Sequence, residues 1–188
     1  MLRQFFERFD LFTPQEIDSI LGLFSKHTLN KNHFLIQEGE KCEAIAFIES
    51  GVFRSFYTTE TGNEITYCFR FPDNLIGAYS AFITGGSSIE SIQALLETTI
   101  WSIQKKELDQ LADVFPKWNT FLKIIAEQQY LELEQRVIQF QRETAQERYR
   151  NLLVNYPNFI QYIPLQYVAS YLGITQRHLS RIRKEIIF

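Results

Sequence analysis

The spacing of apolar residues changes twice along the chain. In residues 14–26 they recur at every third or fourth position, which is the spacing of a helix that buries one face. Thr13 precedes this segment as an N-cap candidate, and Glu16 stands three residues later, where a capping box needs it. The pattern predicts a first helix over residues 14–26.

Residues 30–104 instead contain short runs that are rich in β-branched and aromatic residues. Turn-forming residues separate the runs, among them Gly39, Gly51 and Gly62. The runs are residues 33–37, 44–48, 52–57, 65–69, 89–96 and 98–103. Residues 77–88 interrupt them without a regular pattern. Short strands at this spacing predict a β-roll or jelly roll.

Helical spacing returns after residue 104, first in a short helix over residues 105–114. Residues 118–141 contain no glycine or proline, and they predict a helix of about 36 Å. Its apolar positions follow steps of three and four residues, which are typical of a seam between two helices. The residues assigned to this seam are Phe121, Ile124, Gln128, Leu131, Gln135 and Ile138. The seam predicts a homodimer. The other interpretation is that the helix packs on the roll of its own chain. Because the helix has apolar residues on two faces, we expect it to make both contacts.

A hinge is predicted at residues 142–145, where the pattern of the long helix ends. Thr144 and Glu147 have capping-box spacing, so a further helix begins here and ends near Asn155. Residues 159–163 are predicted to form a short extended connection. The tail therefore contains three helices.

Residues 164–184 predict two short helices joined by a tight turn. Gly173 supplies the left-handed backbone that ends the first helix, and Thr175 is a good N-cap for the second. Ala169 is small where the helices approach each other. The inner faces are Val168 and Leu172 on the first helix, and Leu179, Ile182 and Ile186 on the second. This is the pattern of a helix-turn-helix.

The second of these helices carries an amide and several cations on its outer face. These outward residues are Gln176, Arg177, Ser180, Arg181 and Lys184. A surface helical hairpin with a solvated charged face is the simpler interpretation, and a module for protein contacts is another. The small residue, turn glycine, N-cap and arginine-rich face occur together in one register, which favours a recognition helix that binds double-stranded DNA.

Charge is distributed unevenly between the tail and the rest of the chain. The net charge is −3, but residues 142–188 contain seven basic and three acidic residues. Attraction to phosphate would therefore come from the tail. No apolar run is long enough to span a membrane, and the first residues do not resemble a signal peptide, so we expect a cytoplasmic protein. The two cysteines, Cys42 and Cys68, show no CxxC spacing.

The order helix, roll, long helix and helix-turn-helix resembles the Crp/Fnr family of bacterial transcription regulators. Residues 39–54 are similar to the roll motif of this family, and Glu147-Arg148-Tyr149 with residues 169–183 is similar to its DNA-binding end. The resemblance implies an α+β fold, with a cyclic nucleotide-binding-like β-roll at 1–116, a dimerisation helix at 117–142 and a winged-helix-type helix-turn-helix at 143–188. It also implies a non-enzymatic homodimer that binds near-palindromic DNA, with RNA polymerase as a further partner.

The resemblance also implies roles for the residues of the recognition helix. Gln176, Arg177 and Arg181 would face base edges, where arginine suits guanine and glutamine suits adenine. Thr175, Ser180 and Lys184 would contact phosphates and position the helix without reading sequence.

The family often binds cyclic AMP in the roll, but the matching segment at residues 71–96 departs from that pattern. Gly77 is followed by Ala78 where a ribose-binding glutamate is expected, and Ile89-Glu90-Ser91 replaces an arginine-bearing triplet. Without the guanidinium the phosphate has no bidentate partner. The candidate effector pocket is Gly77, Ala78, Tyr79, Ile89, Glu90 and Ser91. We expect no cyclic AMP and no other identified cofactor.

Two further hypotheses concern the roll. It could be a ligand-free scaffold of a constitutive regulator, or a cupin-like metal enzyme. A metal-dependent cupin needs several histidines around one metal, and only His33 lies within the strand region, which disfavours the enzyme. The cysteine cluster of the family's iron–sulfur sensors is absent from the N-terminal residues.

Overall fold

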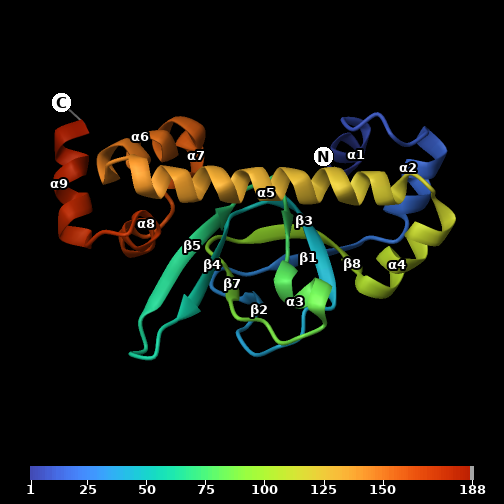
Figure 1. The fold of residues 1–188 in the computed structure, drawn as a ribbon, viewed down its shortest axis with the longest axis horizontal. Coiled ribbons are helices and arrows are strands. Elements are labelled where there is room, and N and C mark those ends of the chain that lie inside the picture. Colours follow the sequence, from blue (N-terminus) through green and yellow to red (C-terminus); the bar gives the residue numbers. More distant parts are fainter. Residues whose placement is uncertain (187–188) are drawn as a thin grey trace. The chain divides into compact units, whose positions relative to one another are not determined.

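The computed structural model describes residues 1–186, without the side chain of Phe159. Its contacts divide the chain into two units. Figure 1 draws the fold as a ribbon and labels its helices and strands where there is room. The first unit comprises residues 1–55 and 69–127, and the second comprises residues 56–68 together with those from 128 onward. The division falls inside the long helix, and it groups residues 56–68 with the C-terminal helices. The predicted three-domain boundaries therefore stay a prediction.

The strands form two four-stranded sheets. They are β1 (Ser25–Leu29), β2 (Phe34–Ile36), β3 (Ala44–Ser50), β4 (Phe53–Thr58), β5 (Glu64–Arg70), β6 (Leu75–Ile76), β7 (Ser91–Ala94) and β8 (Thr98–Gln104). One sheet has the order β1-β8-β3-β6 and the other β2-β7-β4-β5. Strand β8 pairs antiparallel with both β1 and β3. The predicted α+β fold with a β-roll is confirmed.

The helices precede and follow the strands, except for one that interrupts them. They are α1 (Leu2–Glu7), α2 (Pro14–Leu21), α3 (Tyr79–Thr84), α4 (Lys105–Val114), α5 (Trp118–Arg142), α6 (Ala145–Asn155), α7 (Pro157–Ile160), α8 (Leu165–Leu172) and α9 (Gln176–Ile186). The predictions for α4, α5, α6, α8 and α9 are confirmed. Helices α1 and α3 were not predicted. The extended connection at 159–163 is wrong at its start, because Pro157 opens the short helix α7.

The first predicted helix ends earlier than its apolar pattern suggests. Helix α2 stops at Leu21, and residues 25–29 form β1 instead. All five residues of β1 pair with β8, so their backbone groups find partners in the sheet. Phe24 is still buried, in the turn between the two elements. Sheet pairing therefore overrides the helical spacing, and the prediction of a helix to residue 26 is wrong.

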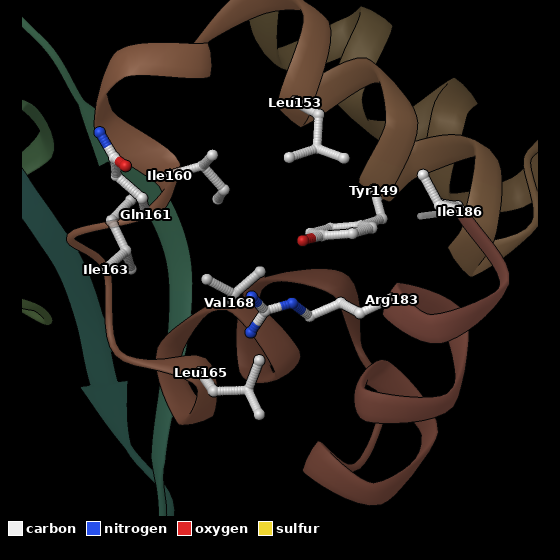
Figure 2. Close-up of a pocket in the computed structure, with 9 residues that line it drawn as sticks. All are labelled: Tyr149, Leu153, Ile160, Gln161, Ile163, Leu165, Val168, Arg183 and Ile186. Atoms are coloured by element: carbon white, nitrogen blue, oxygen red, sulfur yellow. The ribbon is translucent and has the colours of Figure 1, made fainter. Parts of the chain in front are cut away.

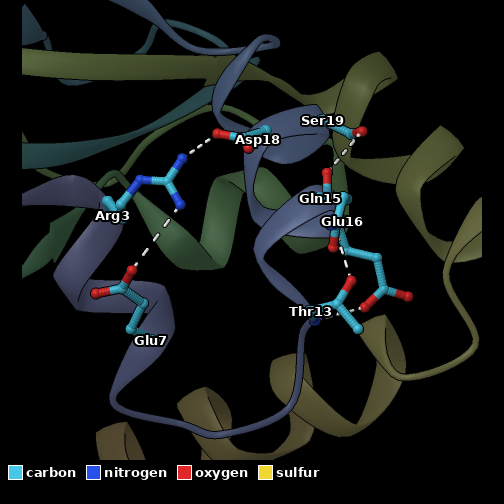
Figure 3. A network of polar contacts seen from close by, with 7 residues as sticks. All are labelled: Arg3, Glu7, Thr13, Gln15, Glu16, Asp18 and Ser19. Carbon is cyan, nitrogen blue, oxygen red and sulfur yellow. Dashed lines mark hydrogen bonds and ion pairs between the residues drawn. The ribbon is translucent and has the colours of Figure 1, made fainter.

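Polar contacts define the start of α2 and its link to α1 (Figure 3). The Thr13 amide donates to the Glu16 carboxylate at 2.7 Å, and the Glu16 amide donates to the Thr13 hydroxyl at 3.3 Å. This is the predicted capping box. Arg3 contacts both Glu7 in its own helix and Asp18 in α2. These exposed ion pairs contribute little stability, so the apolar faces hold the two helices together.

An aromatic cluster occupies the core of the first unit around the start of α5. The Phe121 ring lies 5.4 Å from Phe6, 5.1 Å from Phe9 and 5.0 Å from Trp118. Phe121 is only 2% exposed. Its side chain is enclosed by its own chain and cannot belong to a dimer seam. The assignment of Phe121 to that seam is wrong.

Buried polar groups and close packing shape the interior of the roll. The Arg54 side chain is 2% exposed and donates through Nε and Nη2 to the Gln93 side-chain oxygen at 3.0 and 2.9 Å. Gln93 in turn donates to the Asn32 carbonyl at 3.0 Å. A Cβ at Gly51 would lie 2.2 Å from the Thr98 hydroxyl, so only glycine allows these segments to approach. The roll is therefore tied across its strands by polar as well as apolar contacts.

We predict that Phe121→Ala destabilises the first unit by about 3–5 kcal/mol, because it removes a ring from a close-packed cluster. Chemical denaturation, followed by the fluorescence of Trp101 and Trp118, which both belong to the first unit, measures the change. Val114→Ala is the control, because Val114 is 65% exposed at the end of α4. A loss at Phe121 no larger than that of the control would contradict the assignment of Phe121 to the core.

Candidate nucleic-acid interface

Helices α8 and α9 pack through their apolar faces and are joined by a tight turn. Gly173 has φ 70°, in the left-handed region, and the Ile174 amide donates to the Ala169 carbonyl at 3.0 Å. The Thr175 hydroxyl accepts from the His178 amide at 3.2 Å and so caps α9. The buried residues of the two helices are Val168, Ala169, Leu172, Leu179 and Ile182. The predicted helix-turn-helix is confirmed in these elements.

The outer face of α9 is polar and exposed to solvent. All six residues that are predicted to contact DNA are exposed to solvent: Thr175, Gln176, Arg177, Ser180, Arg181 and Lys184. The same helix carries Arg183 and Lys184 in its last turn, where cations complement the helix dipole. The structure thus brings the six residues together on one accessible side, as a surface for an anionic partner.

Two arginines of α9 line cavities on different sides of the helix. Arg183 lines a cavity of about 220 Å³ with apolar residues of α6, α7 and α8 (Figure 2), and Arg181 lines a second pocket with the start of α6. Figure 2 shows the Arg183 guanidinium extending past Val168, below the ring of Tyr149. Arg183 therefore lies on the flank of the helix rather than on its outer face.

The start of α6 is held by the predicted capping box. The Thr144 amide donates to the Glu147 carboxylate at 2.7 Å, and the Glu147 amide donates to the Thr144 hydroxyl at 3.2 Å. The hydrogen bond from the Thr144 backbone lowers the pKa of Glu147 below its ordinary value of 4.5. Helix α5 ends at Arg142, so the predicted hinge at 142–145 is a two-residue break between helices.

The remaining residues of the predicted dimer seam lie on an open side of α5. Leu131 is 59% exposed and Ile138 is 41% exposed. Gln128 and Gln135 are also exposed, and Ile124 is half-buried. Helix α5 also exposes apolar residues that lie outside the predicted seam, namely Tyr130, Leu133 and Val137.

The candidate effector residues differ in their exposure to solvent. Ala78, Glu90 and Ser91 are buried, whereas Tyr79 is 46% and Ile89 is 72% exposed. Three of them, Ala78, Glu90 and Ser91, face the interior, where the Ser91 hydroxyl accepts from the Glu38 amide at 3.0 Å. Gly77 packs closely against β3, because a Cβ there would lie 2.5 Å from the end of the Ile45 side chain, which would have to shift.

Ser170 makes a contact that sequence reasoning missed. Its hydroxyl accepts from the Thr66 amide of β5 at 2.9 Å and donates to the Glu64 carbonyl at 3.5 Å. The partners are about a hundred residues apart in the chain, and no local pattern indicates the pairing. Helix α8 is thereby attached to β5 within the second unit.

The described residues contain neither a group of side chains placed to hold a metal nor a helix suited to cross a membrane. Within residues 1–186, no group of three or more histidine, cysteine or acidic side chains is placed to hold a metal ion. Over the same range, no helix combines the length and apolar character that crossing a membrane requires.

Similar proteins extend these observations. A family profile for the cyclic nucleotide-binding domain matches residues 26–114. Among curated proteins, the transcriptional activator protein Anr of Pseudomonas aeruginosa is 25% identical over 182 residues, covering 90% of this chain and 74% of that protein. The transcriptional activator FnrA of Stutzerimonas stutzeri is 24% identical over 180 residues, covering 89% of this chain and 73% of its own length.

Solved structures share the fold. FixK2 from Bradyrhizobium japonicum superposes with a TM-score of 0.76 at 18% identity, covering 87% of this chain and 84% of that one. The catabolite activator protein of Thermus thermophilus superposes with a TM-score of 0.58 at 20% identity, covering 94% and 84% of the two chains.

The β-roll, the long helix and the helix-turn-helix, taken with these comparisons, support a transcriptional regulator of the Crp/Fnr family with a cyclic nucleotide-binding-like domain. Its curated relatives are transcriptional activators rather than enzymes.

We predict that Glu147→Gln makes the stability of the second unit less dependent on acid. Because folding lowers the pKa of Glu147, its charge stabilises the folded state above pH 4.5, and this contribution is lost as the pH falls through the folded pKa. Glutamine can still accept the Thr144 hydrogen bond but carries no charge. Thermal unfolding between pH 3 and 7, followed by circular dichroism, should show a gap between wild type and variant that closes on acidification. A gap that is independent of pH would contradict this role.

Proposed function

We propose that this regulator binds a near-palindromic site on double-stranded DNA as a homodimer, with one α9 in each of two successive major grooves. The observation that carries the proposal is the single exposed face of α9, which collects Gln176, Arg177 and Arg181. The tail from residue 142 has an excess of basic residues, while the chain as a whole is acidic. Attraction to phosphate is thus concentrated on the tail that carries the recognition helix.

Within this interface the side chains have different tasks. Arg177 and Arg181 present planar guanidinium groups that can donate two hydrogen bonds to guanine O6 and N7, and Gln176 can pair with adenine. Ser180 and Lys184 have the chemistry of phosphate contacts, and Thr175 stands at the capped start of the helix, close to the backbone of the duplex. The first group would set sequence preference and the second would set orientation.

The dimer would form along α5. Ile124, Leu131 and Ile138 recur at intervals of seven residues, so they follow one line on the helix surface. Two of the three are largely exposed in the single chain. A two-fold pair of these helices would bury them and would place two identical recognition helices for two half-sites. RNA polymerase is the further partner that activation of transcription would require.

The roll would not bind cyclic AMP in the usual way of the family. Ala78 is fully buried among apolar residues, and Ile89 points to solvent, so neither position offers a ribose or phosphate partner. The buried Glu90 adds negative charge beside them, which disfavours an anionic ligand. The roll would then respond to a different small molecule, or serve as a scaffold of a constitutive regulator.

We predict that Arg181→Ala lowers affinity for the operator by about tenfold or more, because a bidentate base contact is lost, and leaves the dimer intact. Duplexes enriched from a random pool by the wild-type protein provide the operator, and fluorescence anisotropy at fixed salt measures affinity. Arg183→Ala removes the same charge from the flank of the same helix and should cost much less. Equal losses for the two variants would reject the assignment of the recognition face.

We predict that Leu131→Glu converts the protein to a monomer, because a charge would be buried at the centre of the seam. Leu133→Glu is the matched control: Leu133 is 60% exposed against 59% for Leu131, but it lies on the opposite side of the helix. Sedimentation equilibrium measures both. The seam would be ruled out if the wild type were a monomer, or if the Leu131→Glu variant remained a dimer.

A further inference from the structure

The end of α8 contacts an arginine of the long helix. Arg136 of α5 is half-buried, and its Nη2 donates to the Tyr171 carbonyl at 3.1 Å. Its guanidinium also lies over the Tyr171 ring, 3.8 Å from the centroid, and 5.1 Å from the centroid of Phe140. One side chain thus holds both the backbone and the ring of the same residue of α8.

A second arginine, from α6, contacts the next carbonyl. The Nη2 of Arg148 donates to the Leu172 carbonyl at 2.9 Å, and its Nη1 donates to the Glu143 carbonyl in the break between α5 and α6. Its guanidinium lies 4.6 Å from the centroid of the Phe140 ring. Arg148 therefore ties the break after α5 to the end of α8.

The two arginines satisfy carbonyls that a helix leaves without partners at its C-terminus, where cations are also favoured by the dipole. Phe140 lies near both guanidinium groups and also limits the turn, because a Cβ at Gly173 would come within 3.0 Å of its ring. We call Arg136, Phe140 and Arg148 the arginine clamp. The clamp grips the residues that immediately precede the turn into α9.

The position of the clamp matters because α8 leads directly into the recognition helix. Two residues of the clamp lie on α5 within the second unit, and the third lies across the break on α6. The break at residues 143–144 and the turn at Gly173 are the two points at which the direction of α9 relative to α5 can change. With the clamp in place, rotation about either point requires the loss of charge-assisted hydrogen bonds.

We propose that Arg136 and Arg148 are positioning residues that fix the direction of α9 relative to α5 and thereby set the half-site spacing that the dimer accepts. This inference rests on the proposed function, since spacing has meaning only for a two-fold DNA-binding dimer. Neither residue touches DNA. Both act by limiting the positions that the two recognition helices take relative to the paired α5 helices.

The spacing of half-sites is the measurement that separates positioning from simple stabilisation. The wild-type protein first enriches its operator from a random pool of duplexes. Variants of that operator then carry spacers one or two base pairs shorter or longer, and one duplex carries a single half-site. Two base pairs displace a half-site by about 7 Å and turn it by roughly 70° around the DNA axis. Fluorescence anisotropy at fixed salt gives the affinity for each duplex.

The test compares Arg136→Gln with Arg142→Gln. Both remove one positive charge from the last turns of α5, but Arg142 is exposed and lies outside the clamp. Arg136→Lys is a third variant, which keeps the charge but lacks the planar fork that donates and stacks together. Thermal unfolding verifies that each variant is folded before its DNA affinities are compared.

We expect the wild type and Arg142→Gln to lose about tenfold in affinity when the spacer changes by two base pairs. Arg136→Gln and Arg136→Lys should each bind the best operator about tenfold more weakly than the wild type. Their affinities for duplexes with different spacers should differ by less than about threefold. Their affinity for the single half-site should equal that of the wild type. Equal losses at every spacer and at the half-site would show a structural role only and overturn the inference. A wild type that binds no duplex would overturn the proposed function, and this inference with it.

Discussion

The second unit depends on a close approach at the end of α8. Gly173 takes a left-handed backbone, and an added Cβ would come within 3.0 Å of the Phe140 ring, so a larger residue would have to move either the turn or the ring. Buried Leu172 and Leu179 pack on either side of this turn. The close packing of the Gly173 turn against Phe140 therefore sets the direction of α9, and with it the direction of the face that carries Arg177 and Arg181.

The roll is closed by comparable constraints on its strands. Gly51 admits the side chain of Thr98, and buried Arg54 is held by Gln93 from β7. A buried guanidinium is costly unless its donors are paired, so these contacts also determine which side chains can occupy the interior. Of the candidate effector residues, Ala78 is part of the packed interior and Ile89 is turned to solvent.

The C-terminal helices and the roll differ in the chemistry of the residues that they offer to a partner. The outer face of α9 is polar, exposed and cationic, and it is assembled from one helix. The roll instead has an apolar interior that includes Cys42, whose thiol pKa is raised by burial.

Local patterns in the sequence were enough to predict most of the strands, the helices α4, α5, α6, α8 and α9, the turn at Gly173, the capping boxes of α2 and α6 and the outer face of α9. All of these rest on residues that are close together in the chain. Long-range contacts, by contrast, make residues 25–29 a strand, place Phe121 in a core and bring Arg183 beside a cavity. They also bond Ser170 to β5 and Arg136 to α8. The physical reason is that pairing and packing between distant segments can override a local period, and a local pattern holds no record of the partner that a side chain will meet.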